Sequence, residues 1–234
     1  MQKIAIITGG SSGIGKETVQ LFLSNNWNVI SLSRSACNIA NVLDIQVDFS
    51  DENFLDKLKV LLSDQLNNAS LITIIHNSCA YYSGTIDNVN IQELNKAWLV
   101  NIIAPIKINQ LVIPHMQPGS SIIYIGSTLS EMAVKNSAPY VISKHAVVGL
   151  MRSTCQDIST IGIHTCCICP GFTDTKMLKE HLTKTGRSLN EIADYITMNR
   201  LIKPQEIADF IWHCSNNPIL NGSVLHANLG FINR

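Results

Sequence analysis

A tyrosine and a lysine stand four residues apart, at Tyr140 and Lys144, in a stretch with helical patterning. That spacing places both side chains on one face of a helix. Because a neighbouring ammonium favours the phenolate, we expect Lys144 to lower the pKa of Tyr140 and make it a usable acid or base. The hydroxyl of Ser127 would be suited to donate to a developing oxyanion. Taken alone, the tyrosine and lysine are better explained as ordinary exposed side chains.

A glycine-rich turn lies near the amino terminus, at Thr8-Gly9-Gly10-Ser11-Ser12-Gly13-Ile14-Gly15. It follows an apolar run and leads into a helical pattern. Gly9 permits a sharp turn, and Gly13 and Gly15 remove side chains that would block a diphosphate. The first turn of the next helix offers unpaired N–H groups to that anion. Since a second strand at Asn28–Ser33 closes a βαβ unit, dinucleotide binding is favoured over a plain tight turn.

Strand-like and helix-like stretches alternate along the chain, which predicts a doubly wound, mainly parallel α/β sheet with helices on both faces, a Rossmann-like fold. We expect one dinucleotide-binding domain over residues 1–234, with ligands at the carboxyl ends of the strands. The expected strands are Ile4–Ile7, Asn28–Ser33, Ile45–Asp48, Leu71–Ile75, Ile122–Ile125, Ile163–Cys169 and Ser223–His226. The expected helices are Ile14–Leu23, one capped by Ser50, Ile91–His115 with a kink at Pro105, Pro139–Ser159 and Gln205–Cys214.

Composition bounds the possible partners. Lysine plus arginine equals aspartate plus glutamate at 17 each, so charge favours neither nucleic acid nor an anionic membrane surface. The chain enters a strand pattern directly, and no apolar run approaches the roughly 20 residues of a membrane-spanning helix. We therefore expect a soluble, cytoplasmic protein. Cysteines and histidines show no zinc-ligand spacing, so no metal site is expected, and Cys166, Cys167 and Cys169 are interpreted as buried free thiols.

Over nearly its whole length, the sequence resembles a classical short-chain dehydrogenase/reductase. The glycine turn matches the TGxxxGxG motif of that superfamily, and Asp48 matches the acidic residue that bonds the adenine ring. Its Asn-Ser-Tyr-Lys tetrad is matched, in order and spacing, by Asn101, Ser127, Tyr140 and Lys144. The segment Pro170-Gly171-Phe172-Thr173 matches the one whose threonine contacts the nicotinamide carboxamide. The cofactor-binding residues that the resemblance and the motifs together suggest are Gly9, Ser11, Ser12, Gly13, Ile14, Gly15, Ser33, Arg34, Asp48, Phe49, Asn77, Ser78, Tyr140, Lys144, Pro170, Gly171, Thr173 and Thr175.

The resemblance implies an NAD(P)(H)-dependent oxidoreductase that interconverts a small carbonyl compound and a secondary alcohol. Tyr140 would pass a proton to or from the substrate oxygen as hydride moves to or from the nicotinamide. Lys144 would hold the nicotinamide ribose, Ser127 would polarise the substrate, and Asn101 would hold a water that links Lys144 to solvent. Two alternatives stay open on the same fold: a dinucleotide-binding regulatory protein without turnover, and a non-redox lyase or epimerase.

One segment departs from the superfamily pattern. It reads His76-Asn77-Ser78-Cys79 where Asn-Asn-Ala-Gly is usual. Asn77 keeps one structural amide, whereas Cys79 puts a side chain near the nicotinamide ribose. For His76 we favour a hydrogen-bonded structural role at a strand end over catalysis.

The end of the second strand bears on the choice of cofactor. An aspartate there would bind the adenosine ribose and repel a 2′-phosphate, but this chain has Ser33-Arg34, with Ser11 nearby. Because a guanidinium is a natural phosphate clamp, we expect NADP(H) to be preferred, with NAD(H) possible. Ser12 stands where a second basic residue is often found.

Two larger features complete the expectations. The polar segment Lys176–Arg200 follows the Pro-Gly turn, which suggests a weakly anchored substrate lid rather than a passive surface loop. Met177 and Leu178 are its expected inward contacts, with the basic residues facing water.

The helix from Pro139 and the one around Trp98 look too apolar for helices with a wet outer face. Together with the pairing of these helices in the superfamily, this predicts a homodimer or homotetramer.

Overall fold

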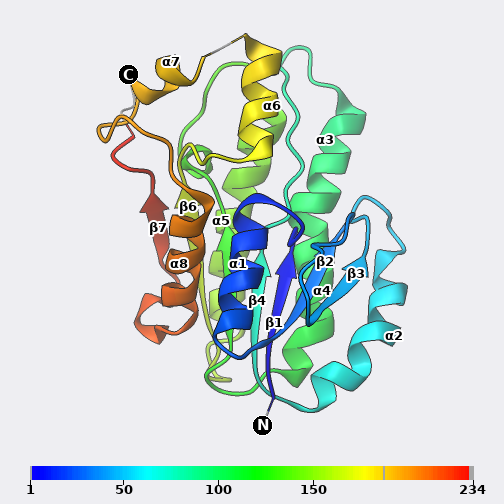
Figure 1. Cartoon of the computed structure of the whole chain (residues 1–234). Helices are drawn as coiled ribbons and strands as arrows, with labels where there is room; N and C mark the ends of the chain where they lie inside the picture. The colour runs from blue at the N-terminus through cyan, green and yellow to red at the C-terminus, as the bar shows by residue number, and fades with distance from the viewer. Residues whose placement is uncertain (1, 187, 232–234) are drawn as a thin grey trace.

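A seven-stranded parallel sheet forms the middle layer of the protein (Figure 1). The computed structural model describes residues 2–186 and 188–231. Strands follow the order β3-β2-β1-β4-β5-β6-β7, and every neighbouring pair is parallel. Most are continuous apolar runs because helices cover both faces of the sheet. Their bounds are β1 Gln2–Thr8, β2 Asn28–Ser33, β3 Val42–Gln46, β4 Ala69–His76, β5 Ser121–Ile125, β6 His164–Pro170 and β7 Val224–Ala227.

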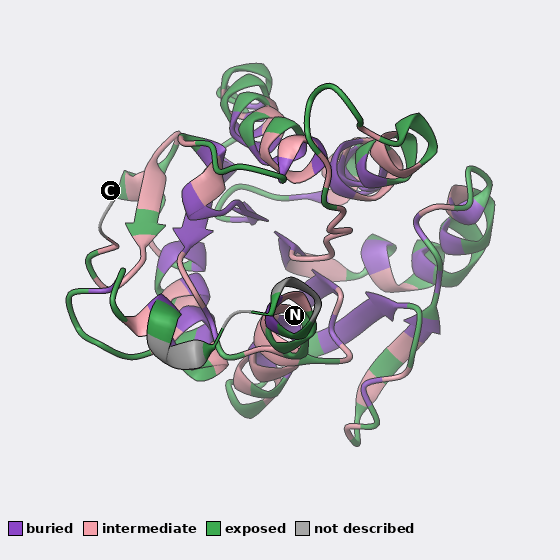
Figure 2. Cartoon of the chain, turned by 90° about the horizontal axis from the view of Figure 1, so that it is seen from above, coloured by how far each residue is buried: buried purple, intermediate pink, exposed green. Residues whose placement is uncertain are grey.

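Helices cover the sheet on its two faces. One face carries α2 (Phe54–Asn67), α4 (Ala104–Val112) and α5 (Ala138–Asp157), and the other carries α1 (Gly13–Ser24) and α8 (Pro204–Ser215). Successive strand residues point to opposite faces, so Ile4 and Ile6 pack under the first group and Ala5 and Ile7 under the second. Figure 2 shows the buried strands between helices whose outer sides are exposed. The predicted doubly wound fold is confirmed.

The order of the strands reverses between β1 and β4, which places the expected ligand crevice at their carboxyl ends. The helices α6 (Lys176–Thr185) and α7 (Leu189–Ala193) lie at this same end of the sheet (Figure 1). Short 3-10 turns at η3 (Thr128–Ser130) and η4 (Pro218–Leu220) complete the connections.

The segment Ile91–His115 is not one kinked α-helix. It consists of α3 (Ile91–Trp98), a π-helical turn η1 (Leu99–Ile103), α4 and a 3-10 turn η2 (Ile113–His115). The N–H of Ala104 bonds the carbonyl of Leu99, five residues back, so the irregularity lies in the turn immediately before Pro105, the turn that a proline disturbs. By length and hydropathy this segment could cross a membrane, contrary to the expectation that no such run exists. In this fold, its apolar residues Ile102 and Ile108 pack into the core against the sheet.

Three further expectations differ from the structure. The third strand was expected over Ile45–Asp48, but β3 ends at Gln46, and α2 begins at Phe54. Ser50 does not cap that helix, because the N-cap position is Asn53. The N–H and hydroxyl of Ser50 instead donate to a carboxylate oxygen of Asp48 at 2.9 and 2.7 Å. The segment Lys176–Arg200 is better anchored than its composition suggests: α6 and α7 share a small apolar cluster, which consists of Leu182, Ile192 and Ile196 with Phe172, Leu178, Leu201 and Leu229 around it.

The cysteines fit their interpretation as packing residues. All seven are free, and Cys166, Cys167 and Cys169 are fully buried along β6. Neighbouring thiols point to opposite faces, so Cys166 joins the cluster under α1 and α8 while the other two join the cluster under α5.

Candidate active site

The glycine turn has the geometry of an anion cradle. Gly9 and Gly13 adopt φ values of +71° and +52°, which favour glycine. A Cβ on Gly15 would overlap the carbonyl oxygen of Gly9, so a side chain there would push the turn apart. Ser12 precedes α1 and makes no side-chain capping bond to any described residue. The first N–H groups of α1 are therefore left for an anion, which the helix dipole also favours.

Hydrogen bonds clamp the ends of β1 and β4 together beneath this turn. The hydroxyl of Thr8 accepts from the backbone N–H groups of Asn77 and Ser78, each at 2.9 Å. The side-chain amide of Asn77 donates to the carbonyl of Thr8 at 3.0 Å. Asn77 thus has the structural role expected of it, and the crevice at the strand reversal has a fixed floor.

Three of the tetrad positions meet at the carboxyl end of β5. Ser127 follows that strand, and its hydroxyl accepts from the N–H of Leu129 at 3.1 Å. On α5, the ammonium of Lys144 donates to the carbonyl of Ile125 at 2.8 Å and lies 5.7 Å from the centre of the Tyr140 ring. Ser127 is also among the groups that lower the pKa of the Tyr140 phenol. The structure therefore brings Ser127, Tyr140 and Lys144 together.

The fourth position, Asn101, lies on the π-helical turn η1 and is buried. Its carbonyl oxygen accepts from the N–H of Ala80 at 2.8 Å. Its amide donates to the carbonyl of Ala80 at 3.0 Å and to the hydroxyl of Ser143 at 2.9 Å. Both amide hydrogens are engaged, so this side chain fastens the loop after β4 to α5.

Electrostatics around Tyr140 overturn one expectation. Burial raises the pKa of the phenol more than the ammonium of Lys144 lowers it, and Cys79 and Tyr81 raise it further. Lys144 thus acts in the expected direction, but the net pKa of Tyr140 lies above its usual value, so the expected net lowering is wrong. Burial lowers the pKa of Lys144, but Cys79, Tyr140 and Cys167 together raise it by more, so it lies above its usual value. Lys144 therefore stays an ammonium near neutral pH.

At the adenosine end, Arg34 follows β2 and Asp48 follows β3, and both are exposed. Hydrogen bonds from Ser50 hold the pKa of Asp48 below its usual range, with a further contribution from Arg34. The hydroxyl of Ser33 donates to the carbonyl of Ser35 at 2.7 Å, so its proton is directed to the chain itself. The ring of Phe49 is buried in the core, which leaves the backbone of that residue to face a ligand.

Residues after β6 close the crevice from the other side. Thr173 is buried, and its hydroxyl donates to the carbonyl of Gly171 at 3.0 Å. Thr175 caps α6 by accepting from the N–H of Leu178 at 3.3 Å. A Cβ built on Gly13 would lie 3.1 Å from the methyl group of Thr175, so the glycine turn faces the start of α6. Among the other expected cofactor contacts, Ser11 and Ile14 are half-buried in or beside the turn, and Pro170 ends β6.

The structure adds two residues that the sequence did not point to. The ring of Tyr81 lies 4.9 Å from that of Tyr140 and 5.0 Å from that of His181 on α6. These contacts link α6 to the tetrad, and no motif or spacing signals them. Of the two expected inward contacts, Leu178 joins the apolar cluster of α6 and α7, whereas Met177 is 43% exposed and its contact with substrate stays a prediction.

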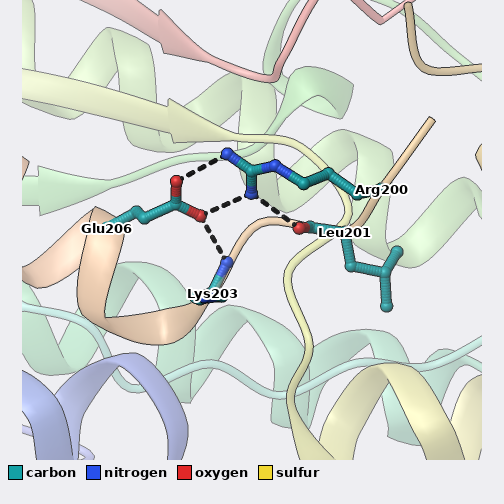
Figure 3. A network of polar contacts seen from close by, with 4 residues as sticks. All are labelled: Arg200, Leu201, Lys203 and Glu206. Carbon is teal, nitrogen blue, oxygen red and sulfur yellow. Dashed lines mark hydrogen bonds and ion pairs between the residues drawn. The ribbon is translucent and has the colours of Figure 1, made fainter. Parts of the chain in front are cut away.

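A polar network fastens the return end of Lys176–Arg200 to α8 (Figure 3). The two terminal nitrogens of Arg200 donate to the two carboxylate oxygens of Glu206, each at 2.7 Å. Glu206 also accepts from the N–H of Lys203 at 2.8 Å. The bond from Arg200 is the largest of the contributions that lower the pKa of Glu206 to about 2.

A parallel sheet with a glycine turn at its strand reversal is the architecture of dinucleotide-binding domains. The family model described as short chain dehydrogenase matches residues 3–186, so the chain belongs to this family of oxidoreductases. The short-chain dehydrogenase anuF of Penicillium roqueforti is 25% identical, and the match covers 89% of this chain and 87% of that one. Ipsdienol dehydrogenase of Ips pini is 27% identical over 94% and 93% of the two chains. The structure of aldohexose dehydrogenase from Thermoplasma acidophilum superposes with a TM-score of 0.88 at 25% identity, covering 98% and 93%.

Proposed function

We propose that this chain is an NAD(P)(H)-dependent oxidoreductase that interconverts a carbonyl compound and a secondary alcohol, with Tyr140 as the acid and base. The observation that carries the proposal is the meeting of Ser127, Tyr140 and Lys144 beside the glycine cradle. A regulatory dinucleotide binder has no use for a phenol held between a hydroxyl and an ammonium. Family membership supports redox chemistry over a lyase or epimerase reaction.

The residues around the crevice fit a nicotinamide dinucleotide. The turn from Gly9 to Gly15 and the free end of α1 would hold its diphosphate. Lys144 would contact the nicotinamide ribose, and Thr173 the carboxamide. When bound, the nicotinamide supplies or accepts the hydride. We further propose that NADP(H) is preferred, because Arg34 is exposed at the end of β2, where a 2′-phosphate would be clamped.

The electrostatics of the site suit proton donation to a carbonyl. Since burial keeps the pKa of Tyr140 above its usual value, the phenol is protonated when a ketone arrives and can give up its proton as the alkoxide forms. Lys144 stays charged beside it and stabilises the phenolate that remains. Ser127 would donate to the same oxygen and orient it. In the reverse direction the phenolate would take the proton from the alcohol.

The proposal extends to the whole chain. Residues 1–234 would act as one domain, with Lys176–Arg200 as a lid that selects the small-molecule substrate. The aromatic contacts from α6 through Tyr81 to Tyr140 support a lid at this place, because they tie its position to the reacting group. A homodimer or homotetramer is proposed as the working form.

Purified protein is tested by absorbance at the reduced-nicotinamide band, with a panel of ketones and secondary alcohols and with each cofactor in turn. We expect substrate-dependent change with at least one pair. Cofactor binding without any change over the panel would instead support a regulatory binder. Product formation without an absorbance change would support a lyase or epimerase.

A further inference from the structure

A chain of buried hydrogen bonds behind the tetrad has a fixed direction. Thr154 uses its single proton on the carbonyl of Leu150, at 2.8 Å, so it must accept from the hydroxyl of Tyr124, at 2.9 Å. Tyr124 therefore accepts from the side-chain amide of Asn109, at 2.6 Å. The carbonyl oxygen of Asn109 is then the atom that meets Nε2 of His76, at 2.8 Å, so Nε2 carries the proton and donates.

This direction decides what the other ring nitrogen of His76 can do. With the proton on Nε2, Nδ1 of the neutral ring is a bare acceptor. It is buried and has no hydrogen-bond partner within the described part of the chain. Burial lowers the pKa of His76 to about 4, so the ring remains neutral near pH 7. A buried acceptor left without a donor is disfavoured, which means that the site calls for a hydrogen-bond donor.

A small cavity adjoins this ring. Its polar lining includes His76, Ser78, Asn101 and Lys144, and it has room for the centre of about one water molecule. The amide hydrogens of Asn101 are already engaged. The ammonium of Lys144 has three protons, of which one goes to the carbonyl of Ile125. A water here would accept from Lys144 and donate to His76.

We infer that one water molecule binds between Nδ1 of His76 and the ammonium of Lys144, and that His76 is a positioning residue for the lysine. The buried chain ends at the carbonyl of Leu150, so it cannot carry protons to solvent. It orients the water instead: Nδ1 takes one hydrogen, and the water turns a lone pair to Lys144. In this chain His76 thus holds a water that the side-chain amide of Asn101 has no free hydrogen to hold. The positioning role rests on the proposed function, whereas the water site does not.

The water site is tested on the unmodified protein without cofactor. A high-resolution crystal structure should show a water about 2.7–3.2 Å from both His76 Nδ1 and Lys144 Nζ. A long-range proton–nitrogen NMR spectrum near pH 7 should place the His76 proton on Nε2 and show Nδ1 as a hydrogen-bond acceptor, with the signal assigned by its loss in His76→Phe. An empty cavity, a proton on Nδ1, or a direct bond from Ser78 to Nδ1 would overturn the inference.

The positioning role is tested with His76→Phe, which keeps a ring but removes the acceptor. The matched control is Thr73→Val, which removes another buried hydrogen bond, the one to Ser121 at 3.0 Å, but leaves the His76 chain and the cavity lining unchanged. Only His76→Phe should lower kcat, by about three- to tenfold, with the substrate KM changed less than about twofold. Equal losses in the two variants would reduce the role of His76 to stability.

The pH profile gives a second readout. Lys144 lowers the pKa of Tyr140, so a lysine that is less well positioned should lower it less. The acidic limb of alcohol oxidation, where Tyr140 becomes protonated, should therefore shift to higher pH in His76→Phe. The other groups that act on Tyr140, namely Cys79, Tyr81 and Ser127, are unchanged by the substitution. An unmoved limb would overturn the positioning role. Wild-type protein with the water in place but no turnover would instead count against the proposed function.

Discussion

At the scale of single residues, the spacing of residues in the sequence predicted which side chains meet, but the sequence did not show how deeply they are buried. The four-residue interval correctly predicts that Tyr140 and Lys144 lie together on α5, because helix geometry is local. The sign of the Tyr140 pKa shift is not local. It depends on desolvation, aided by Cys79 and Tyr81 from the loop after β4, and no pattern in the sequence reports either. The same holds at the adenosine end. The sequence suggested Ser33 as a cofactor contact, but it could not show that the Ser33 hydroxyl donates to the carbonyl of Ser35.

Tyr140→Phe tests the proposed acid and base. The substitution keeps the ring beside Tyr81 but removes the phenol proton, so turnover should fall roughly a hundredfold to ten-thousandfold. The affinity for cofactor should change little, because the ring itself stays in place. Turnover is measured under single-turnover conditions, and cofactor affinity by fluorescence titration. Near-full activity in a correctly folded Tyr140→Phe protein would remove Tyr140 from the mechanism.

Arg34 tests the proposed cofactor preference. A charge-assisted bond to a 2′-phosphate is worth roughly 1.5–3 kcal/mol, so NADPH should bind about tenfold to a hundredfold tighter than NADH. Arg34→Ala should abolish most of that difference and leave NADH binding nearly unchanged. Lys59→Ala is a matched control, because Lys59 is an exposed cation on α2 paired with Asp56 at 3.5 Å. Equal affinities of the wild-type protein for both cofactors would refute the preference.

The buried ring of His76 predicts a pH dependence of stability. Its pKa is lowered from 6.5 to about 4 by burial, so between these values the unfolded chain binds the proton more tightly. The contribution is complete above about pH 6.5 and is lost as the pH falls toward 4, by about 3 kcal/mol. Urea unfolding at several pH values should show a steeper loss in the wild type than in His76→Phe. Parallel curves would mean that His76 charges freely in the folded protein.

At the scale of elements, patterns identified the strands and helices but missed their irregularities. Continuous apolar runs predicted the buried strands, since both faces of a parallel sheet are covered. The π-helical turn η1 was missed because apolar periodicity does not distinguish it from an α-helical turn. The bonds of Asn101 within it, to Ala80 and Ser143, join segments distant in sequence and were not visible either. Ser50 was misjudged as a cap because the helix begins later than expected, at Phe54, and Ser50 lies in the preceding turn, where its hydroxyl donates to Asp48.

The lid proposal makes a prediction at this scale. Hydrogen exchange should slow across Lys176–Arg200 when cofactor and substrate are both bound, while exchange in the sheet strands barely changes. The apolar cluster around Leu182 and Ile192 suggests that this segment moves as a unit. An unchanged exchange rate at saturation would make it a passive surface element and move substrate selection to Thr128–Ala138.

The ion pair that anchors the return end of this segment is tested separately. Arg200 and Glu206 join the return end of the segment to α8 (Figure 3). Arg200→Ala should speed exchange near Arg200 in the free protein, whereas Lys176→Ala, which removes an exposed pair with Glu180 at 3.7 Å, should not. Equal effects of both substitutions would show that the Arg200 network has no special part in holding the segment.

At the scale of the whole molecule, the sequence could not show how much of the apolar excess of α5 serves the core. Val147, Val148 and Met151 are buried in the core under the sheet, so most of that excess serves folding. Ile142 on α5 and Trp98 on α3 remain about 40% exposed. Helical periodicity shows that a face is apolar, but it does not show whether the sheet or a second copy covers that face.

The predicted self-association concerns the apolar side chains that remain exposed. The helices α3 and α5 pack against each other on one face of the sheet, and each keeps a large apolar side chain in solvent, Trp98 and Ile142 respectively. Sedimentation at micromolar concentration should therefore show a dimer or tetramer. Ile142→Glu should shift the protein toward monomer, because a charge in an apolar interface must be desolvated without a partner. Val60→Glu, on the exposed side of α2, is the control and should leave assembly unchanged. A wild-type protein that sediments only as monomer would refute the prediction.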